Sequence, residues 1–342
     1  MRGSRSRPLR LGFFSRLLDE ASPAERYRLA LDQIGHAERL GFDTAWIAQH
    51  HFHENEGGLP SPLVFLAQAA ARTSRIRLAT GIITLPLELP LRVAEDTAVL
   101  DLMTGGRLEV GVGPGGNPSA FAAFELDAAE RNDLFVRNLA LLRRAWTGQE
   151  LPGGDRLYPT NHGLADRVWQ ATFSVSGGAR AGADGDGIML SRTQPRPADK
   201  PGMTIEEIQR PILDAYHAAL PPGREPRVMV SRSVFVADDR EEALRLAAIG
   251  LRRARERLRL PAGGGLPEWL IAANAHVGTA EDVIRSLAAD RTLERATELV
   301  VQVHSIDPPP PMTLRSLELV AERVAPALGW QPAQPLAARH AA

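Results

Sequence analysis

Short apolar runs alternate with longer amphipathic segments along almost the whole chain. Runs rich in β-branched residues predict strands, and segments with apolar positions three or four residues apart predict helices. Strands are expected at residues 9–14, 42–48, 76–85, 107–112, 168–173, 187–190, 227–236 and 298–304. Helices are expected at residues 22–40, 61–72, 90–103, 127–146, 176–183, 204–220, 239–258, 279–287 and 313–328.

This order of elements predicts a parallel sheet, because neighbouring parallel strands have to be joined by crossover segments, which are usually helices. Eight strand–helix units in 342 residues favour an α/β fold of the TIM-barrel type, a (β/α)8 barrel with short insertions, over a doubly wound sheet. We therefore expect a flexible arm at residues 1–8, a single barrel domain at residues 9–330 and a loose tail at residues 331–342. Four prolines at residues 308–311 are interpreted as a stiff approach to the last helix.

Charge and composition exclude several classes of function. The chain has 40 Lys and Arg residues against 41 Asp and Glu residues, so no basic field indicates binding to nucleic acid or to an anionic membrane. It has no cysteine, which excludes disulfides, Cys-ligated zinc, iron–sulfur clusters and thiol nucleophiles. No stretch is apolar enough to span a bilayer, and charged residues interrupt the apolar run near the N-terminus. We expect a cytoplasmic protein that binds neither nucleic acid nor membranes.

The second predicted strand ends in the sequence Gln-His-His-Phe-His at residues 49–53. In barrels of this type the reacting groups lie where the strands end. One interpretation is a metal-dependent hydrolase, because His51 and His53 would point to the same side of an extended segment, although only His304 follows a later strand as a further ligand. The second interpretation is acid–base catalysis by one histidine, whose reference pKa of about 6.5 suits that role. In the third, the histidines only pack a loop.

A glycine-rich turn at residues 111–116 follows the fourth predicted strand and matches the pattern G-x-G-x-x-G. A dinucleotide site is disfavoured, because Pro114 lies inside the turn, helical periodicity resumes only near Asp127, and the motif does not follow the first strand. We interpret the glycines, Gly113 among them, as positions where a ligand approaches the backbone closely, or as a tight surface loop.

A second glycine-rich turn follows the fifth predicted strand and leads into a short helix. Hydroxyl groups, glycines and free N–H groups at a helix N-terminus predict an anion site. The residues concerned are Ser174, Ser176, Gly177 and Gly178. Ordinary capping of the helix by Ser174 or Ser176 is the alternative.

Several segments, in their order and spacing, resemble the bacterial luciferase-like family of flavin-dependent monooxygenases. They are FDTAWIAQHHF at residues 42–52, RTSRIRLATG at 72–81, PLRVAED at 90–96, LDL at 100–102 and GGRL at 105–108. The resemblance extends from residue 11 to about residue 307.

The resemblance implies a (β/α)8 barrel that holds reduced FMN without a covalent bond at its carboxyl-terminal mouth and uses O2 to oxidise a small organic substrate. It implies that His50 is the reactive histidine beside the flavin ring, and no metal site is expected. It places a non-prolyl cis peptide bond between Gly81 and Ile82 under the ring, and the FMN phosphate at Ser174, Ser176, Gly177 and Gly178. It also implies a homodimer, with reduced FMN supplied either by a partner flavin reductase or by direct use of NAD(P)H.

Two positions depart from the pattern of the family. Gln49 stands where the family often has an acid, and Pro114 stands where the luciferase itself has an arginine for the phosphate. Phosphate binding then has to rely on backbone amides or on another cation, such as Arg192.

Three alternatives stay open. The first is the deazaflavin-dependent branch of the same superfamily, which the sequence His-His-Phe at residues 50–52 disfavours. The second is a metal-dependent hydrolase built on His51 and His53, and the third is a flavin-binding relative without catalysis. The loops at residues 149–167 and 193–203 are expected to select the substrate, whose identity the sequence leaves open.

Overall fold

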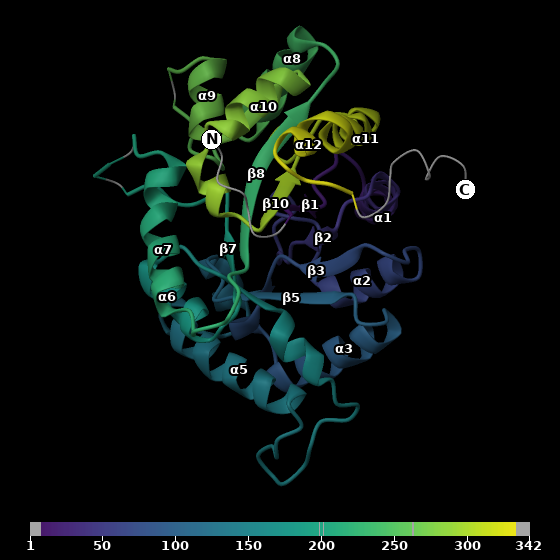
Figure 1. Ribbon diagram of the computed structural model, residues 1–342, viewed down its shortest axis with the longest axis vertical. Coiled ribbons are helices and arrows are strands. Elements are labelled where there is room, and N and C mark those ends of the chain that lie inside the picture. Colours follow the sequence, from purple (N-terminus) through teal and green to yellow (C-terminus); the bar gives the residue numbers. More distant parts are fainter. Residues whose placement is uncertain (1–7, 198, 201, 262, 333–342) are drawn as a thin grey trace.

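The computed structural model describes residues 8–197, 199–200, 202–261 and 263–332, and its centre is a closed barrel of parallel strands (Figure 1). The barrel closes because β10 pairs with both β1 and β8, and all of these pairings are parallel. Its eight strands are β1 (Arg10–Ser15), β2 (Thr44–Ile47), β3 (Arg77–Thr80), β5 (Leu108–Gly113), β6 (Val168–Ala171), β7 (Gly187–Leu190), β8 (Val228–Val236) and β10 (Glu298–Gln302). The predicted fold class is confirmed.

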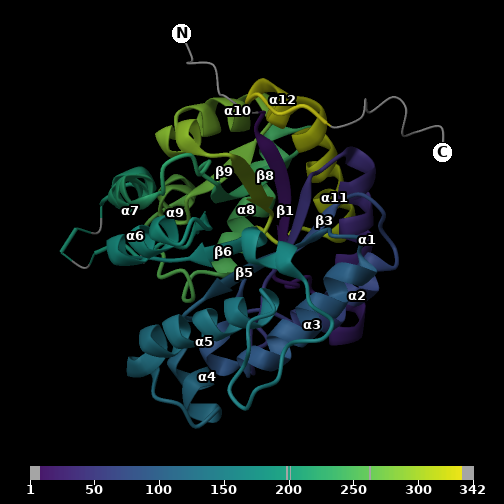
Figure 2. The ribbon, with the colours of Figure 1, turned by 60° about the horizontal axis from the view of Figure 1, so that its bottom comes forward.

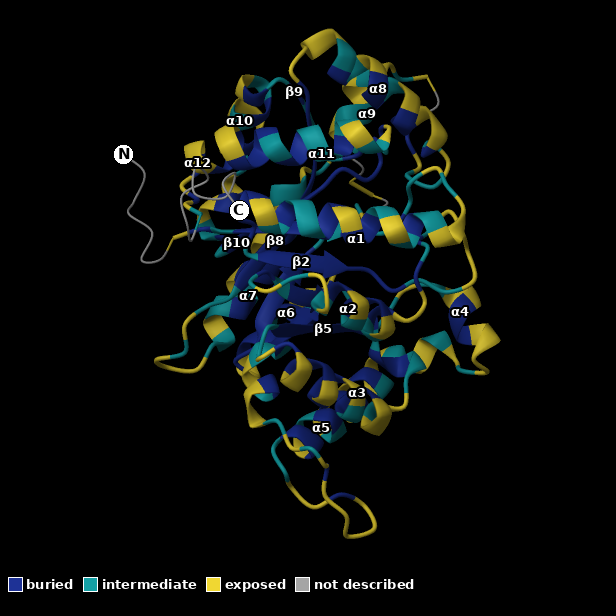
Figure 3. Cartoon of the chain, turned by 90° about the vertical axis from the view of Figure 1, so that its right-hand side faces the viewer, coloured by how far each residue is buried: buried dark blue, intermediate teal, exposed yellow. Residues whose placement is uncertain are grey.

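Helices surround the strands on the outside (Figure 2). They are α1 (Pro23–Leu40), α2 (Pro62–Ala70), α3 (Pro90–Met103), α4 (Pro118–Ala123), α5 (Arg131–Trp146), α6 (Val175–Ala183), α7 (Ile205–Ala219), α8 (Arg240–Arg253), α9 (Leu266–Ala272), α10 (Ala280–Ala288), α11 (Pro310–Leu319) and α12 (Ala325–Ala327). Figure 3 shows buried strands behind helices whose exposed residues face outward, as amphipathic patterning requires. None of the helices in the described ranges combines the length and the apolar composition needed to cross a bilayer.

Local signals in the sequence explain where several helices begin. The side chain of Ser22 accepts a hydrogen bond from the backbone of Glu25 at the start of α1. At α7, Thr204 and Glu207 form a reciprocal capping box. The four-proline run leads directly into α11, as interpreted from the sequence, although the helix begins at Pro310 rather than at residue 313.

The structure corrects the sequence predictions in four places. The strand expected at residues 76–85 is two strands, β3 and the short β4 (Ile83–Thr84). A further strand, β9 (Ala275–Gly278), pairs with the outer half of β8 and was not predicted, and neither was α9. Helical structure resumes at α4, well before Asp127, because Asn117 caps this helix with its side chain. Helix α8 ends at Arg253 rather than at residue 258.

The interior of the barrel is filled by side chains. Trp46 and Trp169 meet edge to face with ring centroids 5.5 Å apart. The same cluster contains Ala79, Met189, Met229 and Val300. Phe14, Ile82 and Ala171 pack on this cluster and are only partly buried. Open space therefore begins above these three side chains rather than inside the barrel.

Charged groups close the amino-terminal end of the barrel. Glu109, at the start of β5, accepts hydrogen bonds from Arg77 Nε at 2.6 Å, Arg10 Nη2 at 3.3 Å and Trp169 Nε1 at 2.6 Å. Burial raises the pKa of this carboxyl, but the charges of Arg10 and Arg77 outweigh it and the net shift is downward. Glu109 is thus ionised and fully paired.

Parts of two expectations lie outside the described residues. The predicted basic arm falls on residues 1–7, apart from Pro8, and the predicted tail falls largely on residues 333–342. The division into an arm, one domain and a tail stays a prediction.

Candidate active site

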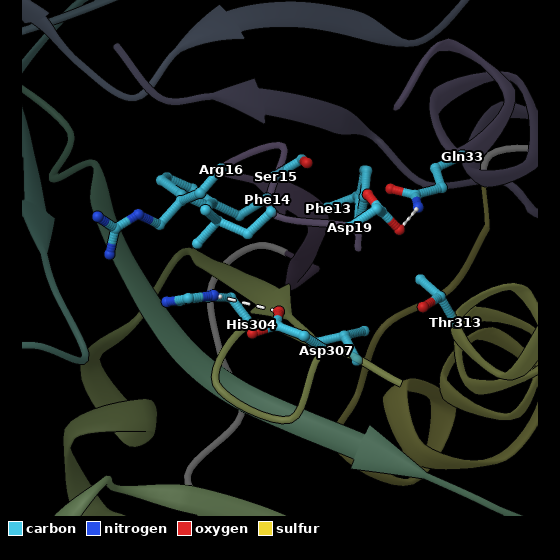
Figure 4. A pocket seen from close by; sticks show the side chains of 11 residues that line it. Phe13, Phe14, Ser15, Arg16, Asp19, Gln33, His304, Asp307 and Thr313 are labelled. Atoms are coloured by element: carbon cyan, nitrogen blue, oxygen red, sulfur yellow. Dashed lines mark hydrogen bonds and ion pairs between the residues drawn. The ribbon is translucent and has the colours of Figure 1, made fainter. Parts of the chain in front are cut away.

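The segments that follow β1, β2, β7 and β10 bring basic side chains to the carboxyl-terminal mouth of the barrel. Arg16 follows β1, His50 follows β2, Arg192 follows β7 and His304 follows β10. In Figure 4, Arg16 and His304 reach into the same small cavity, and Asp307 lies beside the His304 ring. The candidate site is therefore assembled from strands that are far apart in the sequence.

His50 is a neutral group in this environment. Burial lowers the pKa of His50 to about 2, and the positive charge of Arg16 and the neighbouring His304, His51 and Arg257 lower it further. The backbone N–H of His50 donates to the carbonyl of Leu59 at 2.9 Å, which anchors the residue to the following loop. A neutral imidazole has one N–H donor and one acceptor nitrogen, so His50 can hold or pass a single proton. Its predicted catalytic role stays a prediction.

The other two histidines do not form a pair, and the prediction that they share one side of an extended segment is wrong. Phe52 has a φ of 65°, and the N–H of His53 donates to the carbonyl of His51 at 2.8 Å, so the backbone turns. The His51 ring then packs edge-on against Phe124 at 5.1 Å, whereas His53 Nε2 lies 2.7 Å from Ser119 Oγ. The part of the chain that the structure describes contains no group of three His, Cys, Asp or Glu side chains placed to hold a metal ion.

Gln49 connects the end of β2 to β4 and to the segment that follows it. Its Nε2 donates to Glu88 Oε1 at 2.7 Å and to the carbonyl of Pro60 at 3.0 Å, and its Oε1 accepts from the N–H of Thr84 at 2.7 Å. Burial raises the pKa of Glu88. The position where the family often has an acid thus holds a glutamine, and the nearby carboxyl group is that of Glu88, which contacts the glutamine side chain.

The peptide bond between Gly81 and Ile82 is cis, as the resemblance predicts. The Ile82 side chain lies beside Phe14 and Ala171 at the top of the barrel core, and these three residues form the floor of the mouth. A Cβ atom at Gly113 would lie 2.6 Å from Ile82 Cδ1 and 3.4 Å from Ala171 Cβ, so β5 packs closely against this floor at the glycine. Contact of Gly81, Ile82 and Gly113 with a cofactor stays a prediction.

In the turn between β6 and α6, some polar groups are used by the fold and others are free to bind a ligand. Ser174 caps the helix by accepting a hydrogen bond from the N–H of Gly177 at 3.1 Å, so the capping alternative is confirmed for this residue. The glycines serve packing, because a Cβ at Gly178 would lie 2.5 Å from the carbonyl of Ile212 on α7. The amides of Val175 and Ser176 have no acceptor among the described residues, and both residues are exposed. Two free N–H groups at a helix N-terminus suit a phosphate, which stays a prediction for Ser174, Ser176, Gly177 and Gly178.

Sequence reasoning named Arg192, as an alternative cation for the phosphate, but missed Arg16 and Arg257; the role of Arg192 at the phosphate stays a prediction. Arg192 is only 1% exposed, and all three of its guanidinium nitrogens lack a hydrogen-bond partner in the described chain. Burial lowers the pKa of Arg192 to about 9, and the nearby charge of Arg16 acts in the same direction. Arg16 directly follows β1, and this position at a strand end is the signal that could have singled it out. Arg257 comes from the segment after α8, where no signal pointed to it.

A cavity of about 550 Å³ opens beside these residues. Its lining includes His53, Arg257 and Asp307, and Leu18 and Asp307 also line a smaller cavity of about 30 Å³ that reaches Arg16 and His304. The larger volume is in the range of small-molecule sites in proteins. Arg257 thus faces space for a small molecule, whereas Phe14, Arg16 and His304 border the smaller cavity beside it.

Comparison with known proteins shows similarity over most of the chain. The family described as luciferase-like monooxygenase matches residues 11–296. The 4-hydroxyprotoasukamycin monooxygenase of Streptomyces nodosus subsp. asukaensis is 29% identical, and the match covers 89% of this chain and 91% of that protein. The crystal structure of the monooxygenase RslO1 from Streptomyces bottropensis is 27% identical with a TM-score of 0.79, covering 93% of this chain and 99% of that one.

Two more distant structures share the fold. The oxygenating constituent of 3,6-diketocamphane monooxygenase from Pseudomonas putida, in complex with FMN, has a TM-score of 0.74 at 21% identity, covering 94% of this chain and 99% of that one. The coenzyme F420-dependent tetrahydromethanopterin reductase from Methanopyrus kandleri has a TM-score of 0.66 at 18% identity, covering 94% of this chain and all of that one. The same fold thus occurs in proteins named for either cofactor.

Proposed function

Because the chain belongs to the luciferase-like monooxygenase family, we propose that it binds reduced FMN at the barrel mouth and uses O2 to oxidise a small organic substrate. Reduced flavin would supply the two electrons that the activation of O2 requires. Two relatives that match about nine-tenths of the chain are themselves named monooxygenases, which supports an oxygenation rather than a plain hydride transfer.

The observation that carries this proposal is the floor of the mouth. Phe14, Ile82 and Ala171 form an apolar surface that is only partly buried, directly above a packed core. Such a surface suits a flat aromatic ring, because burying it removes apolar area from water. Phe14 lines the small cavity together with Arg16 and His304, and both of these residues lie close enough to His50 to lower its pKa. This residue would therefore hold or pass a proton at one of its ring nitrogens.

The start of α6 suits the phosphate of FMN. The free amides of Val175 and Ser176, the hydroxyl of Ser176 and the positive end of the helix all favour an anion. Ser174 is held in place by its bond to Gly177 and by contact of its Oγ with Ser176 Oγ at 3.2 Å. Because Pro114 offers no charge, these neutral groups would have to bind the phosphate without a guanidinium from the β5 turn.

The test compares FMN with riboflavin, which lacks the phosphate. Titration of the wild-type protein is expected to give at least tenfold tighter binding of FMN. In Ser176→Asp the added carboxylate would repel the phosphate, so the preference should fall to about threefold or less while riboflavin affinity is unchanged. The matched control is Ser22→Asp at the exposed start of α1, which should keep the wild-type preference. Equal affinities in the wild type would contradict the proposed phosphate site.

The deazaflavin alternative shares the fold and differs in the cofactor. Titration with coenzyme F420 under the same conditions separates the two, since we expect saturable binding of FMN and none of F420. Adding NADH or NADPH to the FMN complex, without a reductase, then tells direct use of the nicotinamide from supply by a partner.

A further inference from the structure

The guanidinium groups of Arg16, Arg192 and Arg257 lie near one another at the mouth, and none of them forms an ion pair with a carboxylate of the described residues. Arg192 is 1% exposed, and its Nε, Nη1 and Nη2 have no hydrogen-bond acceptor among the residues described. The Nε atoms of Arg16 and Arg257 are likewise buried without an acceptor. The remaining bonds of these two residues go to backbone carbonyls, from Arg16 to Glu56 and from Arg257 to Asn55.

A buried arginine elsewhere in the chain shows how the fold treats such a group when its role is structural. Arg232, on β8, is 0% exposed. Its Nε donates to Asp290 Oδ2 at 2.6 Å and its Nη2 donates to Gln209 Oε1 at 3.0 Å. Burying an unpaired cation is costly, and the fold avoids that cost at Arg232. At Arg192 the fold does bear the cost of burying an unpaired cation, so a structural role does not explain this guanidinium.

The carboxylates around the cluster do not neutralise it. The negative charges that act on these three arginines are those of Asp307 and Glu56. Asp307 bonds to His304 Nδ1 at 3.2 Å, and Glu56 accepts from Asn117 Nδ2 at 2.7 Å. No carboxylate in the described ranges lies within ion-pair distance of Arg16, Arg192 or Arg257, and the neighbouring histidines are neutral. The cluster keeps an excess positive charge.

Two of the three arginines, Arg16 and Arg257, border open space. Arg257 and Asp307 line the cavity of about 550 Å³, and Arg16, His304 and Asp307 line the smaller one beside it (Figure 4). The charges that act on Arg192 are those of Arg16, Asp307 and Arg257. None of them belongs to β6 or α6, where the phosphate of FMN is proposed to bind.

We propose that the substrate oxidised at this site carries a carboxylate, which Arg192 and Arg16 bind at the mouth of the barrel. This inference rests on the proposed function and adds the class of substrate to it. The planar guanidinium presents paired N–H donors that match the two oxygens of a carboxylate. In a site shielded from water, one such contact orients the rest of the molecule over the floor.

The probes are benzoate and octanoate, each compared with its neutral amide, benzamide or octanamide. Calorimetric titration of the wild-type protein is expected to show at least tenfold tighter binding of one acid than of its amide. Arg192→Met should lower the affinity for that acid at least tenfold and leave the amide unchanged. Arg16→Met is the second variant and should act in the same direction, and Arg144→Met, an exposed position on α5, is the control that should match the wild type. Equal affinity for acid and amide in both pairs, or no binding of either acid, overturns the proposal.

A second experiment tells whether Arg192 binds a substrate carboxylate or the phosphate of FMN, since a guanidinium binds both kinds of anion. FMN and riboflavin are titrated into Arg192→Met, and both affinities are expected to equal those of the wild type. A selective loss of FMN affinity would mean that Arg192 binds the cofactor phosphate, which overturns the carboxylate assignment. Failure of the acids to bind while FMN binds normally rejects this inference alone, whereas failure of the wild-type protein to bind FMN rejects the proposed function.

Discussion

The two ends of the barrel treat buried charge in opposite ways. At the amino-terminal end, Glu109 is 4% exposed and is contacted by two arginines and a tryptophan N–H. At the carboxyl-terminal mouth, Arg192 is equally buried and has no partner in the described part of the chain. A stable fold needs only the paired arrangement seen at Glu109, because paired buried charges are tolerated and unpaired buried charges oppose folding. The difference assigns stability to the closed end and ligand binding to the open end.

The largest effect on stability is expected from disrupting the ion-pair network around Glu109 at the amino-terminal end of the barrel. Glu109→Gln removes the negative charge that pairs with Arg77 and one of the two that pair with Arg10, whose other partner is Glu298. We expect the free energy of unfolding to fall by about 3 kcal/mol. Urea unfolding at pH 7 measures it, with Glu150→Gln as the control because this side chain is 60% exposed. A loss below about 1 kcal/mol would mean that the closed end does not depend on this network.

The second effect is on chemistry rather than stability. His50→Ala removes the imidazole that the family resemblance places beside the flavin ring, and we expect substrate-dependent oxygen consumption with reduced FMN to fall about 100-fold. The thermal unfolding temperature should change little. His162→Ala, an exposed histidine away from the mouth, is the control. Unchanged turnover in His50→Ala would remove this residue from the mechanism.

The third effect has the opposite sign. Arg192→Met replaces an unpaired buried cation by an apolar side chain of similar length, so the free energy of unfolding of the ligand-free protein should rise by about 1–2 kcal/mol. The matched variant Arg232→Met should instead lower it, because Asp290 loses its partner. The pair is compared by urea unfolding. Destabilisation of similar size in both variants would show that Arg192 is structural.

The smallest effect is a pH dependence at the mouth. Burial lowers the pKa of His304 to about 3, with Asp307 opposing and Arg192 and Arg16 adding to the shift. The unfolded chain binds a proton on this histidine below about pH 6.5 and the folded protein does not, so stability falls as the pH drops below that value. Between pH 7.5 and 5.5, His304→Asn should lose about 1 kcal/mol less than the wild type in urea unfolding. Parallel losses would show that His304 is protonated in the folded protein.

The fold could be predicted because each barrel strand is a short apolar run bounded by clear helix signals. The predicted bounds of β7 and α3 agree with the structure at both ends. The predictions failed where periodicity is short or interrupted. The segment containing α9 and β9 is rich in glycine and proline, and α4 has too few residues for a helical pattern to stand out.

The site could be predicted only in part. The strand ends marked the region of His50, and the family resemblance gave the cis peptide bond at Gly81 and Ile82, which no residue pattern indicates. Of the arginine cluster, only Arg192 was named from the sequence, because an arginine after a strand is usually solvated. Whether it is buried without a partner depends on contacts between segments more than 200 residues apart, such as those carrying Arg16 and Arg257.

The central claim is that the open end of the barrel is a site for reduced FMN. The most direct measurement is an anaerobic titration of the wild-type protein with reduced FMN, followed by mixing with O2. We expect saturable binding at one site per chain and rapid oxygen consumption by the complex, with no saturable binding of reduced F420. No binding of reduced FMN, or saturable binding of reduced F420 in its place, would contradict it.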